Sequence, residues 1–466
     1  MQLAALIFVI LSLASMILVP SSFSRLFCVW EMTTFLIFGI IFLWHKIRRN
    51  GLVCFDLFFI PTFFIVNYTH AVFIYPEDDF LPAFQFSTNK DIIPYAISVA
   101  QMAIAMYMMG SVFFERKEGE RNAAKIRVPT MTVNRSAYVS FGVSLAVFVY
   151  VFLSNQIQSG VTHLYPRLMV MILSLIGLSW YYQAQQLGEN ERGLRTLFER
   201  NKLNIVSTIA FTLSQLFIGS RSEVLFLLLM VLLVINSYYV RVRMKYLFPV
   251  VIMGVIAMGF LMITRVTSYN LVEASFAEFI SYGMEVLEES PEAGWLLLTD
   301  LLVNAKTLYD GVDYTQVYGF LYGRSYIPYL FVFIPFGGSF FTRMLTGLEM
   351  DSIHTGYILT DFAQADYGLG TNMIGDLYMN LTLVGVIVLL FVLGGIVAKV
   401  EVPRSRYQFF ILMALFANGI YLVRADIFSW ITFFVFFVIF DWILRLHVSV
   451  SEETESDLGS QPVQTV

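Results

Sequence analysis

The sequence predicts an all-α protein that crosses a membrane many times. Hydrophobic residues make up 58% of the 466 positions and charged residues only 14%, whereas about a quarter of the residues of a soluble domain are charged. The mean hydropathy is +0.72. Many apolar residues occur in runs of about 20, the length that a helix needs to cross a bilayer. These observations favour about 12 transmembrane helices, with one large outer loop late in the chain, before the last helices.

Twelve segments are apolar and long enough to be spans. They lie near residues 3–20, 26–45, 52–75, 92–114, 136–154, 168–187, 203–219, 223–240, 246–264, 381–398, 408–423 and 428–446. No Lys or Arg precedes Arg25, so the first segment lacks the basic start of a signal peptide and is predicted to be a span. Cys28 and Cys54 fall within spans, which excludes a disulfide framework.

Basic residues alternate between successive loops. With the N-terminus inside, the loops predicted to be cytoplasmic and the C-terminal tail hold 20 of the 29 Lys and Arg residues. Because cytoplasmic loops are enriched in Lys and Arg, both termini are predicted to be cytoplasmic. The long loop then faces the outer side.

Four regions follow from this layout. Residues 1–265 hold the first nine spans, 266–380 form the large outer loop, and 381–446 hold the last three spans. Residues 447–466 are polar and acidic and are predicted to form a disordered tail. No internal repeat is visible, which disfavours a transporter built from symmetric halves.

The large outer loop is acidic and contains two elements that are not predicted to span. Residues 273–292 carry apolar side chains at helical spacing, which predicts an amphipathic helix lying on the membrane or on the helix bundle. Residues 327–341 are apolar but are broken by Pro328, Pro335 and two glycines. This stretch is predicted to be re-entrant or interfacial, since irregular backbone at membrane depth must be buried or line a cavity.

The few arginines of the outer side are the candidate anion-binding residues. Arginine offers a planar fork of donors that matches phosphate, and it keeps its charge. Arg221 and Arg324 are flanked by Gly and Ser, which permit close approach of a ligand. Arg343 and Arg424 are weaker candidates. Each could instead anchor a helix end among lipid headgroups, and Arg424 could pair with Asp426.

His354 and Asp376 are the candidate bases. His354 is the one histidine of the large loop, and imidazole titrates near neutral pH and suits proton transfer. A lone histidine is nevertheless more often structural, and Asp351, Asp361 and Asp366 compete for the same role. The sequence has no His-x-x-x-His or Asp-x-Asp motif and no phosphate-binding Gly-rich loop, so no metal and no cofactor are predicted.

Three short stretches resemble the bacterial O-antigen polymerases of the Wzy type, which are oligosaccharide repeat-unit polymerases. They are GSRSEVLFLLL at 219–229, YGRSYIPYLFVFIP at 322–335 and GLGTNMIGDLYMNLTLVGVIV at 368–388. The layout of twelve spans with a late outer loop is also similar, and it implies a GT-C-like architecture. The last stretch holds an Asn-x-x-x-x-Gly motif formed by Asn380 and Gly385. The chain differs after Ile-Pro, where Phe336 and two glycines replace the usual arginine.

The resemblance implies a metal-independent glycosyltransferase of the bacterial inner membrane, acting at the periplasmic face. The growing glycan would leave undecaprenyl diphosphate and be joined to an incoming lipid-linked repeat unit. Arg221 and Arg324 would then stabilise the diphosphate, with Arg343 and Arg424 less certain, and His354 or Asp376 would accept the proton of the acceptor hydroxyl. A Wzz-type chain-length regulator and a flippase are candidate partners, and nothing indicates nucleic acid. Four tyrosines could stack on sugar rings or lie at the membrane interface: Tyr309, Tyr314, Tyr318 and Tyr322.

Two other functions remain open. An O-antigen ligase would share the late loop and the arginine and histidine chemistry. A flippase or other transporter would need polar residues within the spans, and Glu31, Asp56, Gln101 and Gln215 are the candidates.

Overall fold

In the computed structural model of the chain, every regular element of the described residues is a helix, as the composition predicts. The structure describes residues 1–116, 128–153, 166–188, 191–218, 220–249, 251–254, 281, 285, 288, 295, 298–331, 338–349 and 351–459. The chain divides into two compact units. The first holds residues 1–123, 242–404 and 418–430, and the second holds 124–241, 405–417 and 431–466.

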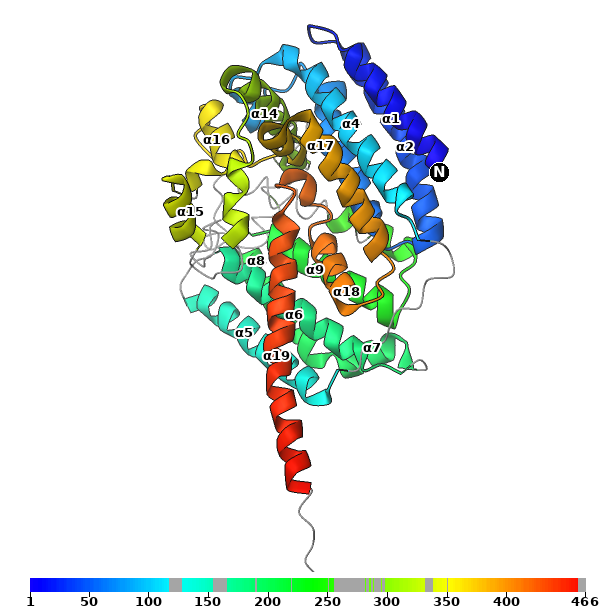
Figure 1. Cartoon of the computed structure of the whole chain (residues 1–466), viewed down its shortest axis with the longest axis vertical. Coiled ribbons are helices and arrows are strands. Elements are labelled where there is room, and N and C mark those ends of the chain that lie inside the picture. Colours follow the sequence, from blue (N-terminus) through cyan, green and yellow to red (C-terminus); the bar gives the residue numbers. More distant parts are fainter. Residues whose placement is uncertain are drawn as a thin grey trace, which may run out of the picture. The chain divides into compact units, whose positions relative to one another are not determined.

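The first unit is built mainly on five helices: α1 (Gln2–Ile17), α2 (Arg25–Asn50), α3 (Phe55–Thr69), α4 (Ile93–Phe113) and α17 (Met373–Val400). Its shorter elements include α13 (Thr299–Leu302), α14 (Asn304–Tyr318), the 3₁₀ helix η6 (Arg324–Phe331), α15 (Gly338–Thr346), α16 (Thr355–Phe362) and the 3₁₀ helix η8 (Leu422–Arg424). In Figure 1, α14 lies beside the upper end of α17, and α16 and α15 are drawn further to the left.

The second unit contains α5 (Thr130–Leu153), α6 (Pro166–Gln185), α7 (Leu194–Arg200), α8 (Lys202–Ile218), α9 (Ser222–Val234), α18 (Arg406–Ala417) and most of α19 (Ser429–Gly459). Helix α19 extends past residue 447, where the composition predicts a disordered tail. Adding turns to an existing helix needs no new nucleus, so a polar segment can extend a span. Residues 460–466 lie outside the described residues.

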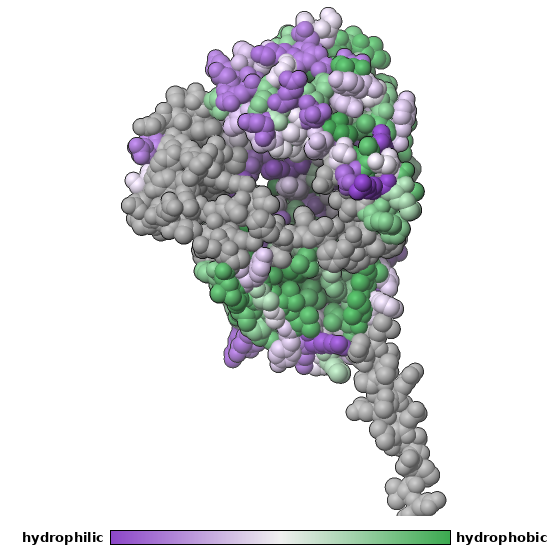
Figure 2. Space-filling model, turned by 90° about the vertical axis from the view of Figure 1, so that its left-hand side faces the viewer, coloured by the Kyte–Doolittle hydropathy of each residue, from purple (hydrophilic) through white to green (hydrophobic). Residues whose placement is uncertain are grey.

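Within the described part of the chain, six helical segments are long and apolar enough to cross a membrane. They are Arg25–Asn50, Phe55–Ile74, Lys90–Phe113, Thr130–Leu153, Ser222–Tyr239 and Met373–Val400. Each coincides with a predicted span, and the total of twelve stays a prediction. Figure 2 shows hydrophobic residues covering broad parts of the surface, as lipid-facing helices require. The amphipathic helix predicted at 273–292 lies, apart from single positions, outside the described residues.

Helix α17 begins eight residues before the position that hydropathy predicts. Its backbone leaves helical geometry at Thr382, with φ 62° and ψ −173°, a conformation that residues other than glycine rarely adopt. An arm of nine residues, 373–381, precedes this break, and an apolar helix follows it. The arm carries Asp376 and Asn380, which lower its hydropathy, so the predicted span starts at residue 381.

Helices α4 and α17 pack backbone against backbone. A Cβ atom on Gly110 would lie 2.0 Å from the carbonyl oxygen of Phe391, and one on Gly394 would lie 2.1 Å from that of Tyr107. Small residues at such contacts allow membrane helices to approach closely. This contact fixes α17 in the first unit.

A buried charge cluster joins the ends of four helices. Lys46 is fully buried, and its Nζ lies 3.4 Å from a carboxylate oxygen of Glu401, 3.8 Å from Glu115 and 3.9 Å from Asp56. Arg49 lies 3.3 Å from Glu115. The C-terminal ends of α2, α4 and α17 therefore meet the N-terminal end of α3, which agrees with the predicted alternation of helix directions. The cluster also gives Asp56, a candidate transport residue, a structural partner.

Candidate functional site

The break in α17 frees two carbonyl groups that a neighbouring segment uses. In an unbroken helix each carbonyl would accept a bond from the residue four positions later. Here Leu321 N donates to Met379 O at 2.8 Å, and Gly323 N donates to Asn380 O at 3.1 Å. The Ser325 hydroxyl donates to the Asn380 side chain at 2.9 Å. Two of the stretches that carry the sequence resemblance thus bind each other at this break.

Asp376 is fully buried on the arm of α17 that precedes the break, and it connects three elements. Its Oδ2 accepts a hydrogen bond from the Tyr326 hydroxyl of η6 at 2.7 Å. Its Oδ1 accepts from the Thr355 hydroxyl of α16 at 2.6 Å and from Asn380 Nδ2 at 3.3 Å. The carboxyl group therefore fixes η6 and the start of α16 against α17.

Asp426 is the second buried carboxyl group of this region and is 6% exposed. The Tyr329 hydroxyl donates to its Oδ2, and Phe428 N donates to its Oδ1 at 3.0 Å. Burial raises the pKa of Asp426, while the Tyr329 hydrogen bond and the charge of His354 oppose this rise. The ring of Tyr326 meets that of Phe428 edge-on, with centroids 4.8 Å apart.

These groups form what we call the carboxyl site: Asp376, Asp426, Tyr326, Tyr329 and His354. The two tyrosines are three positions apart on a 3₁₀ helix, so they lie on one side of it, and each donates to one carboxyl group. Burial and the charge of Asp376 raise the pKa of Tyr326, which keeps its hydroxyl a donor. Among the described residues, no Lys or Arg lies within 4 Å of either carboxylate. Buried carboxyl groups without a cation are costly, and they are typical of functional sites.

Arg324 is the arginine nearest this site along the chain, at the first position of η6. It follows Tyr322 and Gly323, whose φ values of 52° and 78° form a left-handed turn. Its side chain is exposed, and within the described ranges it makes no ion pair. Burial raises the pKa of Tyr314, and the nearby charge of Arg324 acts against it. The guanidinium of Arg324 is therefore accessible to an anion.

Arg343 and Arg424 have other partners. Arg343 lies on α15 and pairs with Glu349 at 2.9 Å, where both side chains are largely exposed. Arg424 ends η8, and its Nη1 lies 3.8 Å from a carboxylate oxygen of Asp300, whereas no ion pair of the described residues joins it to Asp426. No described contact brings Arg343 to the carboxyl site.

Arg221 belongs to the second unit, where it precedes α9 and its carbonyl accepts a hydrogen bond from Leu225 N at 3.1 Å. Its side chain is half-buried. Arg324, His354 and Asp376 are thus the predicted residues that one region of the first unit brings together.

The four predicted sugar-stacking tyrosines differ in exposure. Tyr309 is fully buried and hydrogen-bonds to His70 Nδ1 at 3.2 Å, so its ring has no exposed face for a sugar. Tyr318 and Tyr322 are 68% and 82% exposed, and the Tyr314 ring lies 5.1 Å from that of Tyr318. These last three form an aromatic surface near Arg324.

The sequence prediction missed Asp426, Tyr326 and Tyr329 as site residues. The available signals were two tyrosines three positions apart around Pro328 and an acidic residue in an otherwise apolar turn. Within the residues that the structure describes, no group of three His, Cys, Asp or Glu is arranged to hold a metal ion.

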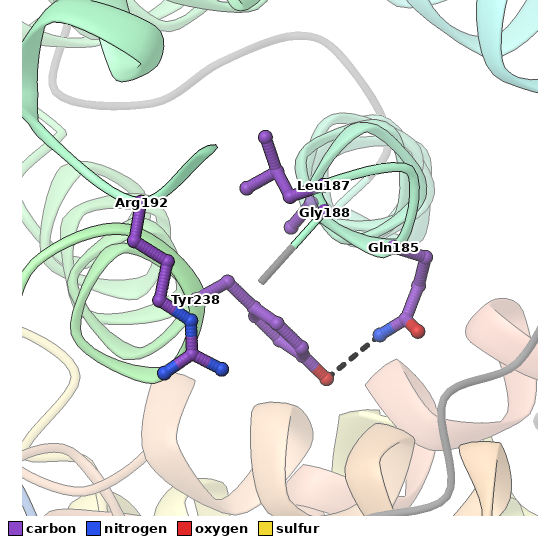
Figure 3. A pocket seen from close by; sticks show the side chains of 6 residues that line it. Gln185, Leu187, Gly188, Arg192 and Tyr238 are labelled. Carbon is purple, nitrogen blue, oxygen red and sulfur yellow. Dashed lines mark hydrogen bonds between the residues drawn. The ribbon is translucent and has the colours of Figure 1, made fainter. Parts of the chain in front are cut away.

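A separate pocket lies in the second unit. It is lined by Ala184, Gln185, Leu187, Gly188, Arg192 and Tyr238. Gln185 Nε2 donates to the Tyr238 hydroxyl at 2.8 Å (Figure 3). The lining has no carboxyl group and no imidazole, so it lacks a group suited to accept a proton from a hydroxyl.

No curated protein and no solved structure matches the chain significantly. The family described as O-antigen polysaccharide polymerase Wzy matches residues 194–450, more than half of the chain. This range includes η6, α17 and every candidate site residue, which confirms the resemblance seen in the sequence. The chain therefore belongs to the O-antigen polysaccharide polymerase Wzy family.

Proposed function

We propose that this protein polymerises undecaprenyl-diphosphate-linked oligosaccharide repeat units into O-antigen or a related surface polysaccharide. The family membership supports a role in O-antigen polymerisation. The observation that carries the proposal is the break in α17. Two carbonyl groups at the break hold the turn before the exposed Arg324, and Arg324 begins η6, the short helix whose Tyr326 donates to Asp376 of the carboxyl site.

Arg324 is the leading candidate to bind the diphosphate of the donor. A glycosyl diphosphate is already activated, so the enzyme must mainly stabilise the charge that develops on the leaving group. A guanidinium can do this without a metal ion, since it binds phosphate oxygens in pairs. The hydrogen bonds of Leu321 and Gly323 to α17 hold the backbone before Arg324 in place. Arg221, Arg343 and Arg424 remain further candidates.

His354 is the better candidate for the base. Asp376 is fully buried and already accepts three hydrogen bonds, so its oxygens are poorly placed to receive a proton from a substrate. His354 is partly exposed at the start of α16. In this proposal Asp376 positions Thr355 and Tyr326, and His354 accepts the proton of the acceptor hydroxyl.

The proposed location of the site in the membrane follows from the loop charges. The basic loops favour cytoplasmic termini and a site on the periplasmic side of the inner membrane. Tyr318 and Tyr322 would offer aromatic faces to sugar rings. A Wzz-type chain-length regulator and a flippase would work with the enzyme.

The test is complementation of a strain that lacks the gene. Loss of a polymerase leaves lipopolysaccharide with one repeat unit, whereas loss of a ligase or flippase leaves none. The wild-type gene is expected to restore the ladder of long chains. Arg324→Ala is expected to restore none, because the leaving diphosphate loses its counter-charge, although the protein accumulates normally.

Arg195→Ala is the matched control, because Arg195 is 90% exposed and pairs with Glu199 four positions away. It is expected to restore the full ladder. A normal ladder in the deletion strain would overturn the proposed function. Normal ladders from both Arg324→Ala and Arg221→Ala would overturn the diphosphate site.

A further inference from the structure

Arg324 lies between two residues that Asn380 holds. Gly323 N donates to the Asn380 carbonyl oxygen at 3.1 Å, and the Ser325 hydroxyl donates to the Asn380 side-chain oxygen at 2.9 Å. Asn380 and Ser325 are buried, while the side chain of Arg324 is exposed. One residue of α17 therefore contacts the chain on both sides of the candidate diphosphate-binding arginine.

The backbone around Arg324 is also fixed by bonds within its own turn. Arg324 N donates to Leu321 O at 3.1 Å, and Leu321 N donates to Met379 O at 2.8 Å. Tyr326 N donates to Gly323 O at 3.0 Å. The Cα atom of Arg324 consequently has a fixed place beside α17, and only rotation of the side chain is left to bring the guanidinium to a ligand.

The partners of the Asn380 amide determine which way it faces. Its Nδ2 donates to the carbonyl oxygen of Asp376 at 2.9 Å and to Asp376 Oδ1 at 3.3 Å. A backbone carbonyl can only accept, so Nδ2 must face Asp376 and Oδ1 must face Ser325. The Ser325 hydroxyl is therefore the donor of the bond that follows Arg324.

Asp376, which holds the Asn380 amide, is itself fixed from two sides. Its N donates to Asn372 O at 2.8 Å, and its Oδ1 also accepts from the Thr355 hydroxyl of α16 at 2.6 Å. The amide that receives Ser325 is thus part of a rigid, buried network. Support of this kind is what the precise placement of a reacting side chain requires.

We propose that Asn380 is the positioning residue for Arg324, and that it places the guanidinium where the diphosphate of the donor leaves. This inference rests on the proposed function. A guanidinium binds two phosphate oxygens at once only when its plane and its distance match. A misplacement of about 1 Å can lower a rate about 100-fold. Holding residues 323 and 325 prevents the backbone motion that would cause such a misplacement.

The test uses Ser325→Ala, which removes one bond to Asn380 and leaves the amide in place. The full chain in membrane vesicles extends the lipid-linked repeat unit extracted from the deletion strain, and the leaving product, undecaprenyl diphosphate, is added as an inhibitor. Ser325→Ala is expected to lower kcat about ten-fold, because the guanidinium is misplaced. It is also expected to raise the inhibition constant of undecaprenyl diphosphate about five-fold, the effect of one lost hydrogen bond. An unchanged inhibition constant, which does not depend on the amount of folded protein, would overturn the inference.

Thr355→Val is the matched control. It removes another buried hydroxyl of the same network, but one that is bonded to Asp376 and follows His354. It is expected to lower kcat and to leave the inhibition constant of undecaprenyl diphosphate at the wild-type value. Ser325→Thr keeps the hydroxyl and is expected to recover most of the loss seen in Ser325→Ala. An equal rise of the inhibition constant in Thr355→Val, or no recovery in Ser325→Thr, would contradict the role of Asn380.

Asn380→Ala removes the acceptor of the same bond. It is expected to raise the inhibition constant at least as much as Ser325→Ala does. Because both changes break one bond, the double variant is expected to match Asn380→Ala alone. A further rise in the double variant would show that Ser325 acts independently of Asn380 and would overturn the inference.

A second double-mutant cycle, with Arg324→Lys, tests whether Ser325 acts through the arginine. Lysine carries a compact charge on a flexible stem, so its contact with phosphate depends less on the position of the backbone. Ser325→Ala is expected to change kcat and the inhibition constant less than about two-fold in the Arg324→Lys background, since coupled residues are not additive. Losses that multiply would overturn the inference. Wild-type vesicles that extend no chain would instead overturn the proposed function.

Discussion

Buried carboxyl groups lie near both ends of α17, but the groups that contact them differ. At the C-terminal end, Glu401 belongs to the charge cluster, where Lys46 lies within 4 Å of three carboxylates. At the N-terminal end, Asp376 and Asp426 receive hydrogen bonds from tyrosine, threonine, asparagine and backbone groups. No Lys or Arg approaches these two carboxylates in the described part of the chain.

This difference distinguishes carboxyl groups that stabilise the fold from carboxyl groups that serve the reaction. A buried carboxylate beside a buried cation is stable only as a pair, and it holds the joined elements together. A buried carboxyl group without a cation destabilises the fold and persists where chemistry needs it. The non-helical backbone at Thr382 also lies on the N-terminal side, and such strain is typical of functional sites.

Removing the cation of the charge cluster should have the largest effect. Lys46→Met is expected to cost about 3–5 kcal/mol of folding free energy, because it leaves buried carboxylates uncompensated. Thermal unfolding of the purified protein in detergent measures this loss. Lys399→Met, an exposed lysine of the same helix end, is the control and should change stability by less than about 1 kcal/mol. Equal stability of the two variants would contradict the role of the cluster.

Filling the space at the break should affect chain extension more than stability. A Cβ atom on Gly385 would lie 2.1 Å from the Cβ of Leu381, so Gly385→Ala must shift the backbone that receives the Arg324 turn. We expect Gly385→Ala to lower the rate of chain extension at least about ten-fold, since small misplacements of catalytic groups are costly.

Gly368→Ala is the control for this substitution, because no atom lies within 4 Å of its added Cβ. It should extend chains at the wild-type rate in the same vesicle assay. If Gly385→Ala also did so, the geometry of the break would not matter for the reaction.

Hydropathy predicts much of this architecture. Six of the predicted spans coincide with helices of spanning length, and the alternation of directions agrees with the meeting of helix ends around Lys46. It misplaces the start of α17, because Asp376 and Asn380 lower the hydropathy of the arm before Thr382. The arm is helical through its packing, in which Gly375 lies against α14.

The carboxyl site was only partly predictable. Its members His354 and Asp376, and Arg324 beside it, follow from residue chemistry and the resemblance. The tyrosine–carboxyl bonds join positions 50 and 97 residues apart in the chain, and no local pattern connects such distant residues. Arg424 and Asp426 are neighbours in sequence, which suggests a pair, but the fold directs the arginine towards Asp300.

The most direct test compares one neutralised carboxyl group from each end of α17. Asp376→Asn and Glu401→Gln are measured side by side for thermal unfolding in detergent and for chain extension in vesicles. The account predicts that Asp376→Asn extends no chains and loses less stability than Glu401→Gln, because the asparagine oxygen can still accept from Thr355 and Asn380 and no buried cation is left unpaired. Glu401→Gln should extend chains but unfold at a lower temperature, because Lys46 loses a partner. The opposite pattern, with Asp376→Asn active and destabilised and Glu401→Gln inactive and stable, would contradict the account.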